Sequence, residues 1–214
     1  MNRVNNTKYA DSRWDWLYKL SGLAALVVGV LFLIPVIDLI LTRLQPATIN
    51  GPLSLFQNNW LVLIFKLHAG FKGVQSNSLY VLNFLDITIL VLAGAMFLGL
   101  YVALRRTNKI WPIVALAQPF LGALIFMATK TAGRSGLMGA GLVISIVMLR
   151  SKIFNKVTAY LGILSSILLL VGDISLGIVH SYIIAILTGI GFMLMTVWFF
   201  LIAQRLIQLG QGVS

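Results

Sequence analysis

The sequence predicts an all-α fold: an integral membrane helical bundle of about six transmembrane helices, with one interfacial or re-entrant helix in the first outer loop. Hydrophobic residues make up 59% of the 214 residues and charged residues only 10%, whereas a soluble domain is about 25% charged. Six apolar runs approach the roughly 20 residues that a helix needs to cross the hydrocarbon core. Short basic tracts separate these runs, as topology determinants do. We expect residues 1–214 to form a single domain whose solvent is the lipid bilayer.

The first apolar run covers residues 17–41. Trp14, Trp16 and Tyr18 precede or open it, and such aromatic clusters are typical of the membrane interface. The run is longer than the 7–15 apolar residues, roughly, of a signal peptide, so we predict a retained first helix. Pro35 lies near its far end and is expected to kink it.

The long connection 42–79 contains a short apolar stretch, 53–67, which we interpret as an interfacial or re-entrant helix. A seventh crossing there is the alternative, which the distribution of basic residues disfavours. The second and third crossings are predicted at 80–104 and 110–129. Pro112 falls in the first turn of the third, where its missing N–H costs nothing.

The fourth run, 136–149, is short. At 1.5 Å per residue it extends only about 21 Å, which is tolerated at membrane depth when protein or a water-filled cavity surrounds the segment. The fifth run is predicted at 157–171, with an extension towards residue 178. The sixth is predicted at 182–206.

The basic residues predict the orientation of these crossings. An excess of Lys and Arg marks the cytoplasmic side, so both termini are predicted there, in a multi-pass protein of the cell membrane. The Lys and Arg residues lie in short tracts between the apolar runs and are not clustered on one soluble face, which argues against a nucleic-acid partner despite a net charge of +11. The eleven residues placed inside are Arg3, Lys8, Arg13, Lys19, Arg105, Arg106, Lys109, Arg150, Lys152, Lys156 and Arg205, and the five placed outside are Arg43, Lys66, Lys72, Lys130 and Arg134.

Two further patterns indicate a packed bundle with tight inner turns. Thr107 or Asn108 can cap the third helix, and Asn155 can cap the fifth. Small residues four apart let helix backbones approach closely in lipid. The pairs are Ala25/Gly29, Ala95/Gly99, Gly136/Ala140, Gly162/Ser166 and Ala185/Gly189.

Polar residues gather at the predicted outer level of several helices. Ionisable groups in membrane segments are costly and usually have a partner, and Asp86 has Lys130 and Arg134 as candidates. One hypothesis is a proton relay or polar substrate site, and the other is a set of ion pairs that fix helix packing and depth. The candidate residues are Asp86, Asp173, Asp38, Asn83, Lys130, Arg134 and His180.

The segment Gly133-Arg134-Ser135-Gly136 opens the short fourth run, and His180 lies just before the sixth. This arrangement resembles the rhomboid intramembrane proteases, whose nucleophile is the serine of a Gly-x-Ser-Gly motif at the start of a short fourth helix. The resemblance implies Ser135 as nucleophile and His180 as base. The alternative is a Gly-rich helix entrance with Ser135 as an N-cap.

A broader resemblance covers most of the chain. It rests on residues 12–25, on LYVALRRTNK at 100–109, on the stretch at 140–164 that contains MLRSK, and on the tail from Trp198 to Gly210. These segments resemble an uncharacterised bacterial family of polytopic membrane proteins, the domain of unknown function 4386 family. The resemblance implies a multi-helix membrane fold and carries no activity. The sequence differs from that family between the third and fourth runs, at 127–136.

Other chemistry lacks a signature in the sequence. There is no Cys, no Walker loop, no dinucleotide-binding glycine pattern and no His/Glu metal spacing, so we expect no cofactor and no metal. The two functional hypotheses are therefore a non-enzymatic membrane protein, permease-like or an accessory subunit, and an intramembrane serine hydrolase. The expected partners are the bilayer and either another membrane protein or a second copy of the chain.

Overall fold

The structure is a computed structural model that describes residues 12–44, 84–129, 135–176 and 182–212. Side chains are described for 13–33, 88–125, 136–172 and 186–212. Within these ranges all regular structure is helical, which confirms the all-α class. A short turn of 3-10 helix, Ser12–Trp14, leads into the first of the α-helices: α1 (Asp15–Leu44), α4 (Phe84–Leu104), α5 (Trp111–Thr129), α6 (Ser135–Leu149), α7 (Lys156–Leu176) and α8 (Tyr182–Gly210).

Each predicted apolar run coincides with one of these helices. α1 continues through Pro35 to Leu44, and α7 reaches Leu176, which confirms the predicted extension of the fifth run. α8 continues four residues beyond the predicted end, because Ile207 and Leu209 extend its apolar face. The predicted helix at 53–67 lies outside the described residues.

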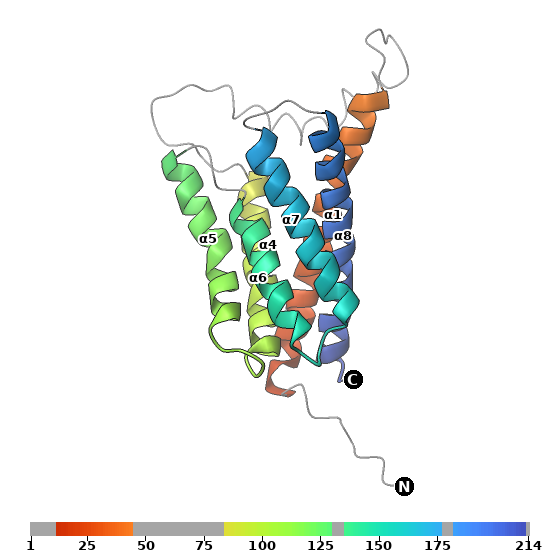
Figure 1. The fold of residues 1–214 in the computed structure, drawn as a ribbon. Helices are drawn as coiled ribbons and strands as arrows, with labels where there is room; N and C mark the ends of the chain where they lie inside the picture. Colours follow the sequence, from red (N-terminus) through yellow and green to blue (C-terminus); the bar gives the residue numbers. More distant parts are fainter. Residues whose placement is uncertain (1–11, 45–83, 130–134, 177–181, 213–214) are drawn as a thin grey trace.

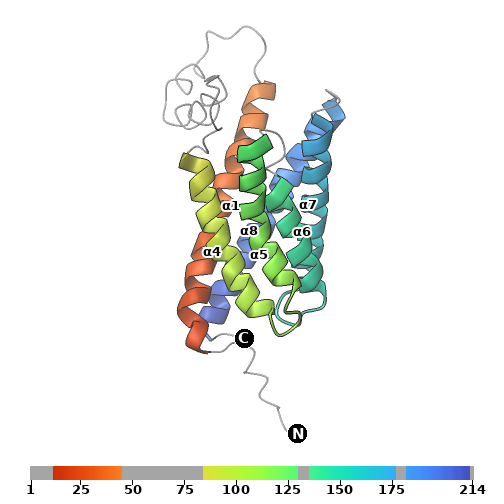
Figure 2. The same ribbon diagram turned by 90° about the vertical axis from the view of Figure 1, so that its left-hand side faces the viewer.

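The helices form a closed ring of neighbours (Figures 1 and 2). Each helix packs against the next along the chain, from α1 through α4, α5, α6 and α7 to α8, and α8 returns to pack against α1. Successive helices run in opposite directions, so the turn between α4 and α5, the turn between α6 and α7, and the end of α8 share one end of the bundle. We call this end the basic end, for the charges described below.

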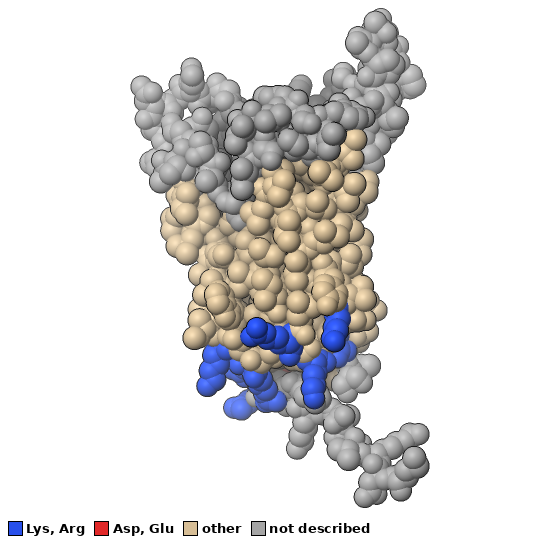
Figure 3. Space-filling model, viewed as in Figure 1, with Lys and Arg blue, Asp and Glu red and all other residues tan. Residues whose placement is uncertain are grey.

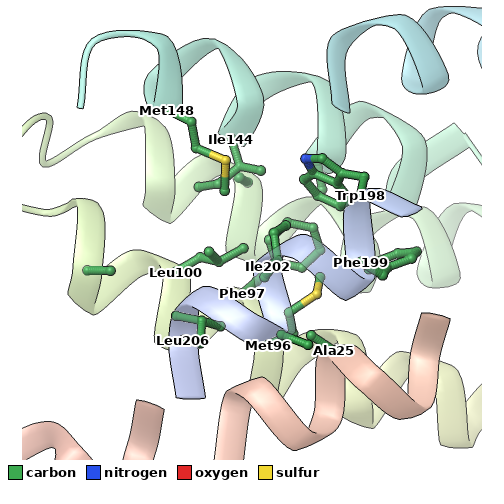
Figure 4. Close-up of a cluster of buried hydrophobic side chains, with 14 of the residues drawn as sticks. Ala25, Met96, Phe97, Leu100, Ile144, Met148, Trp198, Phe199, Ile202 and Leu206 are labelled. Carbon is green, nitrogen blue, oxygen red and sulfur yellow. The ribbon is translucent and has the colours of Figure 1, made fainter. Parts of the chain in front are cut away.

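The centre of the ring is filled by large apolar side chains. Phe97 of α4 and Ile144 of α6 are fully buried, as are Trp198 and Leu206 of α8. Figure 4 shows these side chains meeting between the helices. Phe32 of α1 stacks edge-on against Phe199, with ring centroids 5.0 Å apart. The polar groups of Ser145, Ser166 and Trp198, described below, are therefore fully buried in this packing.

A glycine lies at every contact between ring neighbours. A Cβ added to any of these glycines would meet an atom of the facing helix at 3.0 Å or less, in most cases a side-chain atom, so each glycine makes room for its neighbour. This is the packing that small residues permit in helical bundles. The contacts pair Gly99 with Ser21, Gly94 with Phe120, Gly136 with Gly122, Gly141 with Ser166, Gly162 with Trp198, and Gly22 with Ile207.

The helix caps predicted for the inner turns are confirmed. The Oδ1 of Asn108 accepts hydrogen bonds from the backbone N–H groups of Ile110 and Trp111, at 2.9 and 3.1 Å. The Oδ1 of Asn155 accepts one from Val157 at 3.1 Å. These bonds satisfy N–H groups that the first turn of a helix leaves without partners. The turns are thereby held short and the helices they join remain adjacent.

Candidate functional site

The predicted outer polar layer falls on helix ends that share one end of the ring. Asp38 lies in the last two turns of α1, Asp86 is the third residue of α4, and Asp173 lies in the last turn of α7. These ends of α1, α4 and α7 lie opposite the basic end (Figure 1). The side chains of all three aspartates lie outside the described residues, so whether they pair stays a prediction.

The other predicted site residues also fall largely outside the described part. Asn83, Lys130, Arg134 and His180 lie outside it entirely. Ser135 is placed by its backbone alone, as the first residue of α6.

The first residue of α6 does not lie level with the last residue of α5, but deeper in the bundle. A Cβ built on Gly136 would lie 2.7 Å from the carbonyl oxygen of Gln118 and 2.8 Å from the Cα of Gly122. Gly122 lies seven residues before Thr129, the last residue of α5, which corresponds to about 10 Å along a helix. α6 therefore begins about two turns below the end of α5, and this explains how a helix of 15 residues fits beside one of 19.

A group of polar atoms lies buried between α6, α7 and α8. The hydroxyls of Ser145 and Ser166 and the indole N–H of Trp198 have no hydrogen-bond partner among the described residues. All three residues are fully buried. Gly141 and Gly162 lie directly against them, and a Cβ built on Gly141 would be only 2.9 Å from Ser166 Oγ. Helix backbone therefore covers these atoms closely, so we interpret the group as a packing seam rather than as a ligand site.

A fourth buried polar atom without a described partner is the side-chain oxygen of Gln118 in α5. Gln118 precedes Pro119, which lies inside the helix and cannot donate a backbone hydrogen bond. The amide of Gln118 lies over Gly139, whose Cβ would be 3.3 Å from its Nε2. Gln118 and Pro119 together form a polar break near the middle of α5.

The opposite end of the bundle carries the described basic side chains. They belong to the start of α1, to the turns at residues 105–110 and 150–155, to the first residue of α7, and to the end of α8. Figure 3 shows the Lys and Arg side chains at this end, below a surface of uncharged residues. Among the side chains that the structure describes, the acidic one is that of Asp15, at the start of α1. The basic residues are Arg13, Lys19, Arg105, Arg106, Lys109, Arg150, Lys152, Lys156 and Arg205.

Two of these cations stabilise the basic end. Arg205 of α8 donates from Nε to the carbonyl oxygen of Ile153 at 2.8 Å, which ties α8 to the turn between α6 and α7. The guanidinium of Arg105 lies over the ring of Trp14, 5.4 Å from its centroid. A cation over an indole face is attracted by the ring quadrupole. The end of α4 is thereby fixed against the segment that leads into α1.

A groove opens at the basic end between the start of α5 and the end of α6. Its volume is about 220 Å³, well above the roughly 10–15 Å³ that a site needs to hold one water. No pattern in the sequence predicts this groove, because its two walls come from different helices. The lining residues are Thr107, Asn108 and Trp111 on one side and Val143, Ile146, Val147 and Arg150 on the other.

The described residues hold no group of three or more His, Cys, Asp or Glu side chains that could bind a metal ion. Two of the described helical segments are long and apolar enough to cross a membrane, Asp15–Leu33 with a mean hydropathy of 1.9 and Ile186–Gly210 with 2.2. No family profile, no curated protein and no solved structure matches the chain.

Proposed function

We propose that the protein is a non-enzymatic integral membrane protein, permease-like or an accessory membrane subunit, whose six helices cross the bilayer. The observation that carries the proposal is the outer surface of the ring. Every helix exposes large apolar side chains, and a water-soluble protein rarely exposes so much contiguous apolar surface. One example from each helix is Leu23 (55% exposed), Val91 (62%), Leu124 (58%), Ile146 (46%), Leu164 (49%) and Ile190 (43%).

The helix lengths support six crossings. With a rise of 1.5 Å per residue, the 21 residues of α4 and of α7 extend about 32 Å, and the 19 of α5 about 29 Å. The hydrocarbon core is about 30 Å thick. α6 extends only about 22 Å, which is less than the thickness of the core. It lies between α5 and α7 and begins beside Gly122 of α5, so its first residue has protein beside it, as a short membrane segment requires.

The charges and aromatic residues support a cytoplasmic basic end. Basic residues accumulate on the cytoplasmic side of membrane proteins, and Trp and Tyr accumulate at the interfaces. Trp16, Trp111 and Tyr160 lie near the basic end with 62%, 52% and 61% of their surface exposed. This arrangement favours both termini in the cytoplasm, because the 3-10 turn Ser12–Trp14 and the end of α8 lie at that end.

The absence of cysteine in the sequence permits a clean test of this topology. Single cysteines would be introduced as Ser76→Cys, Lys152→Cys and Gly212→Cys, and intact cells treated with a membrane-impermeant maleimide. We expect labelling of Ser76→Cys in intact cells, and of the other two only after permeabilisation. Labelling of Gly212→Cys in intact cells, or recovery of the chain in the soluble fraction without detergent, would refute the proposal.

For a permease, the sequence predicts that Asp86 takes part in proton coupling. Asp86→Asn should abolish proton-coupled flux while leaving the amount of folded protein in the membrane unchanged. Asp15→Asn, at the basic end, is the matched control. Undiminished flux in Asp86→Asn would exclude this role and favour the accessory subunit.

The position of α6 favours one second candidate, the intramembrane serine hydrolase. Ser135 begins this 15-residue helix about two turns below the end of α5, a depth at which such a nucleophile would act. A serine needs an adjacent base to attack an amide, and His180 is the candidate. A fluorophosphonate probe tests it: labelling that disappears in Ser135→Ala and persists in Ser151→Ala would establish the hydrolase, and an unlabelled wild-type protein would exclude it.

A further inference from the structure

The groove at the basic end combines two kinds of surface. Its α6 wall is apolar and contains Val143, Val147 and the half-exposed Ile146. The lining also includes Arg150, which is exposed, and Trp111, which is 52% exposed; we call the part of the groove beside these two residues its mouth. An apolar wall that ends in a cation and an indole is complementary to a molecule with an acyl chain and an anionic head.

The charge around the mouth is one-sided. The turn at residues 105–110 supplies Arg106 and Lys109, and the turn at 150–155 supplies Lys152, with no acidic residue in either turn. Basic pockets between helices on the cytoplasmic side of membrane proteins attract anionic lipid headgroups. A zwitterionic headgroup would bring its ammonium group against these cations and lose part of the attraction.

We propose that this groove binds one anionic phospholipid, with the phosphate on the Arg150 guanidinium and an acyl chain along Ile146. The proposal rests on the proposed membrane location. An arginine holds a phosphate through two parallel N–H donors, which lysine cannot reproduce. The groove of about 220 Å³ is small compared with the 300–1,000 Å³, roughly, of sites that enclose a whole ligand. It therefore accommodates the headgroup and the first carbons, while the rest of the chain remains in the bilayer.

The test compares lipids on the full-length protein purified in a neutral detergent. Native mass spectrometry would measure retention of phosphatidylglycerol and of phosphatidylcholine, and thermal unfolding would measure the stabilisation that each confers. We expect phosphatidylglycerol to be retained and to raise the unfolding temperature, and phosphatidylcholine to do neither. Equal retention of the two lipids would overturn the proposal, as would equal stabilisation by free glycerol phosphate, which would indicate an anion site without a chain.

Three variants separate the groove from the general charge of the basic end. Arg150→Gln should weaken phosphatidylglycerol binding about tenfold, because it removes a charge-assisted hydrogen-bond donor. Ile146→Trp should weaken binding by filling the apolar wall. Lys156→Gln removes an exposed charge outside the groove and should leave binding unchanged. If Arg150→Gln and Lys156→Gln weaken binding equally, the attraction is diffuse and the site does not exist.

These outcomes are separate from those of the topology experiment. A chain that remains soluble without detergent would refute the membrane location itself. A chain that inserts with the expected cysteine labelling but shows no preference for phosphatidylglycerol would refute only the lipid site. The helical content of each variant, measured by circular dichroism before lipid is added, establishes that the weakened binding does not arise from misfolding.

Discussion

Gly99→Ala is expected to destabilise the bundle strongly, because α1 and α4 have no room for an extra methyl group at this point. The added Cβ would overlap both the Cβ and the Oγ of Ser21, and that Oγ donates a 2.7 Å hydrogen bond to the carbonyl oxygen of Ala95. Ordinary carbon contacts begin near 3.5 Å, so the helices must separate by about 1 Å. Such a shift would also stretch the hydrogen bond beyond its normal range.

The magnitude follows from these two effects. Overpacking a close contact costs about 1–3 kcal/mol. Loss of a hydrogen bond between helices adds about 1 kcal/mol. The sum, about 2–4 kcal/mol, corresponds to a fall of about 4–16 °C in unfolding temperature for a chain of this size. Thermal unfolding of the purified protein in detergent, followed by circular dichroism, would measure it.

Gly94→Ala is the matched control on the same helix. The Cβ there would meet Cζ of Phe120 at 2.7 Å, but this ring is 42% exposed and can swing aside. Its unfolding temperature should stay within a few degrees of wild type. In a double-mutant cycle, Ser21→Gly should make Gly99→Ala less costly, because it removes the atoms that the methyl group meets. Equal stability of Gly99→Ala and Gly94→Ala, or strict additivity in the cycle, would refute the reasoning.

Three further predictions concern buried polar contacts and the basic end. Ser21→Ala should cost about 1 kcal/mol, because it removes the hydrogen bond to Ala95. Ser145 is equally buried, but its hydroxyl has no hydrogen-bond partner among the described residues, so Ser145→Ala should be neutral or stabilising. Chemical denaturation would measure both variants, and a greater loss of stability in Ser145→Ala would contradict the prediction. Gly162→Ala should lower the free energy of unfolding by about 1–3 kcal/mol, because the added Cβ would overlap the Trp198 indole. The helices would separate, so a red shift in tryptophan fluorescence is expected. An unshifted spectrum together with full stability would contradict the prediction. Arg205→Gln should cost about 1 kcal/mol and increase amide exchange in the turn at 150–155, because it removes the bond to Ile153; unchanged exchange there would show that the bond contributes little.

The helices were predictable from the sequence because each is a long apolar run ended by basic, glycine or capping residues. Asn108 and Asn155 were predicted as caps, and the side-chain hydrogen bonds are found where expected. The small pair Ala95/Gly99 was predicted to lie at a helix contact, but its partner Ser21 was not. Spacing along one helix identifies a face for close approach, whereas the helix that it meets depends on how the whole ring closes.

The candidate sites were less predictable for the same reason. Arg150 was assigned only to topology, because the sequence does not reveal that it lies across a groove from Trp111. The hydroxyls of Ser145 and Ser166 and the indole of Trp198, which have no hydrogen-bond partner in the described part of the chain, come from three helices, so their proximity appears only in the folded bundle. The backbones of Asp38, Asp86 and Asp173 do lie at one end, as the alternating direction of the helices requires.

The contact between α1 and α8 has a consequence for biosynthesis. Gly22 and Gly29 of α1 lie against Ile207 and Phe200 of α8, so this face of α1 meets its neighbour only after α4, α5, α6 and α7 have been synthesised. Until then α1 has its neighbour α4, but the face that carries Gly22 and Gly29 lacks α8. A chain that ended before α8 would therefore leave this face of α1 open, as incompletely folded proteins expose surface that the finished fold buries.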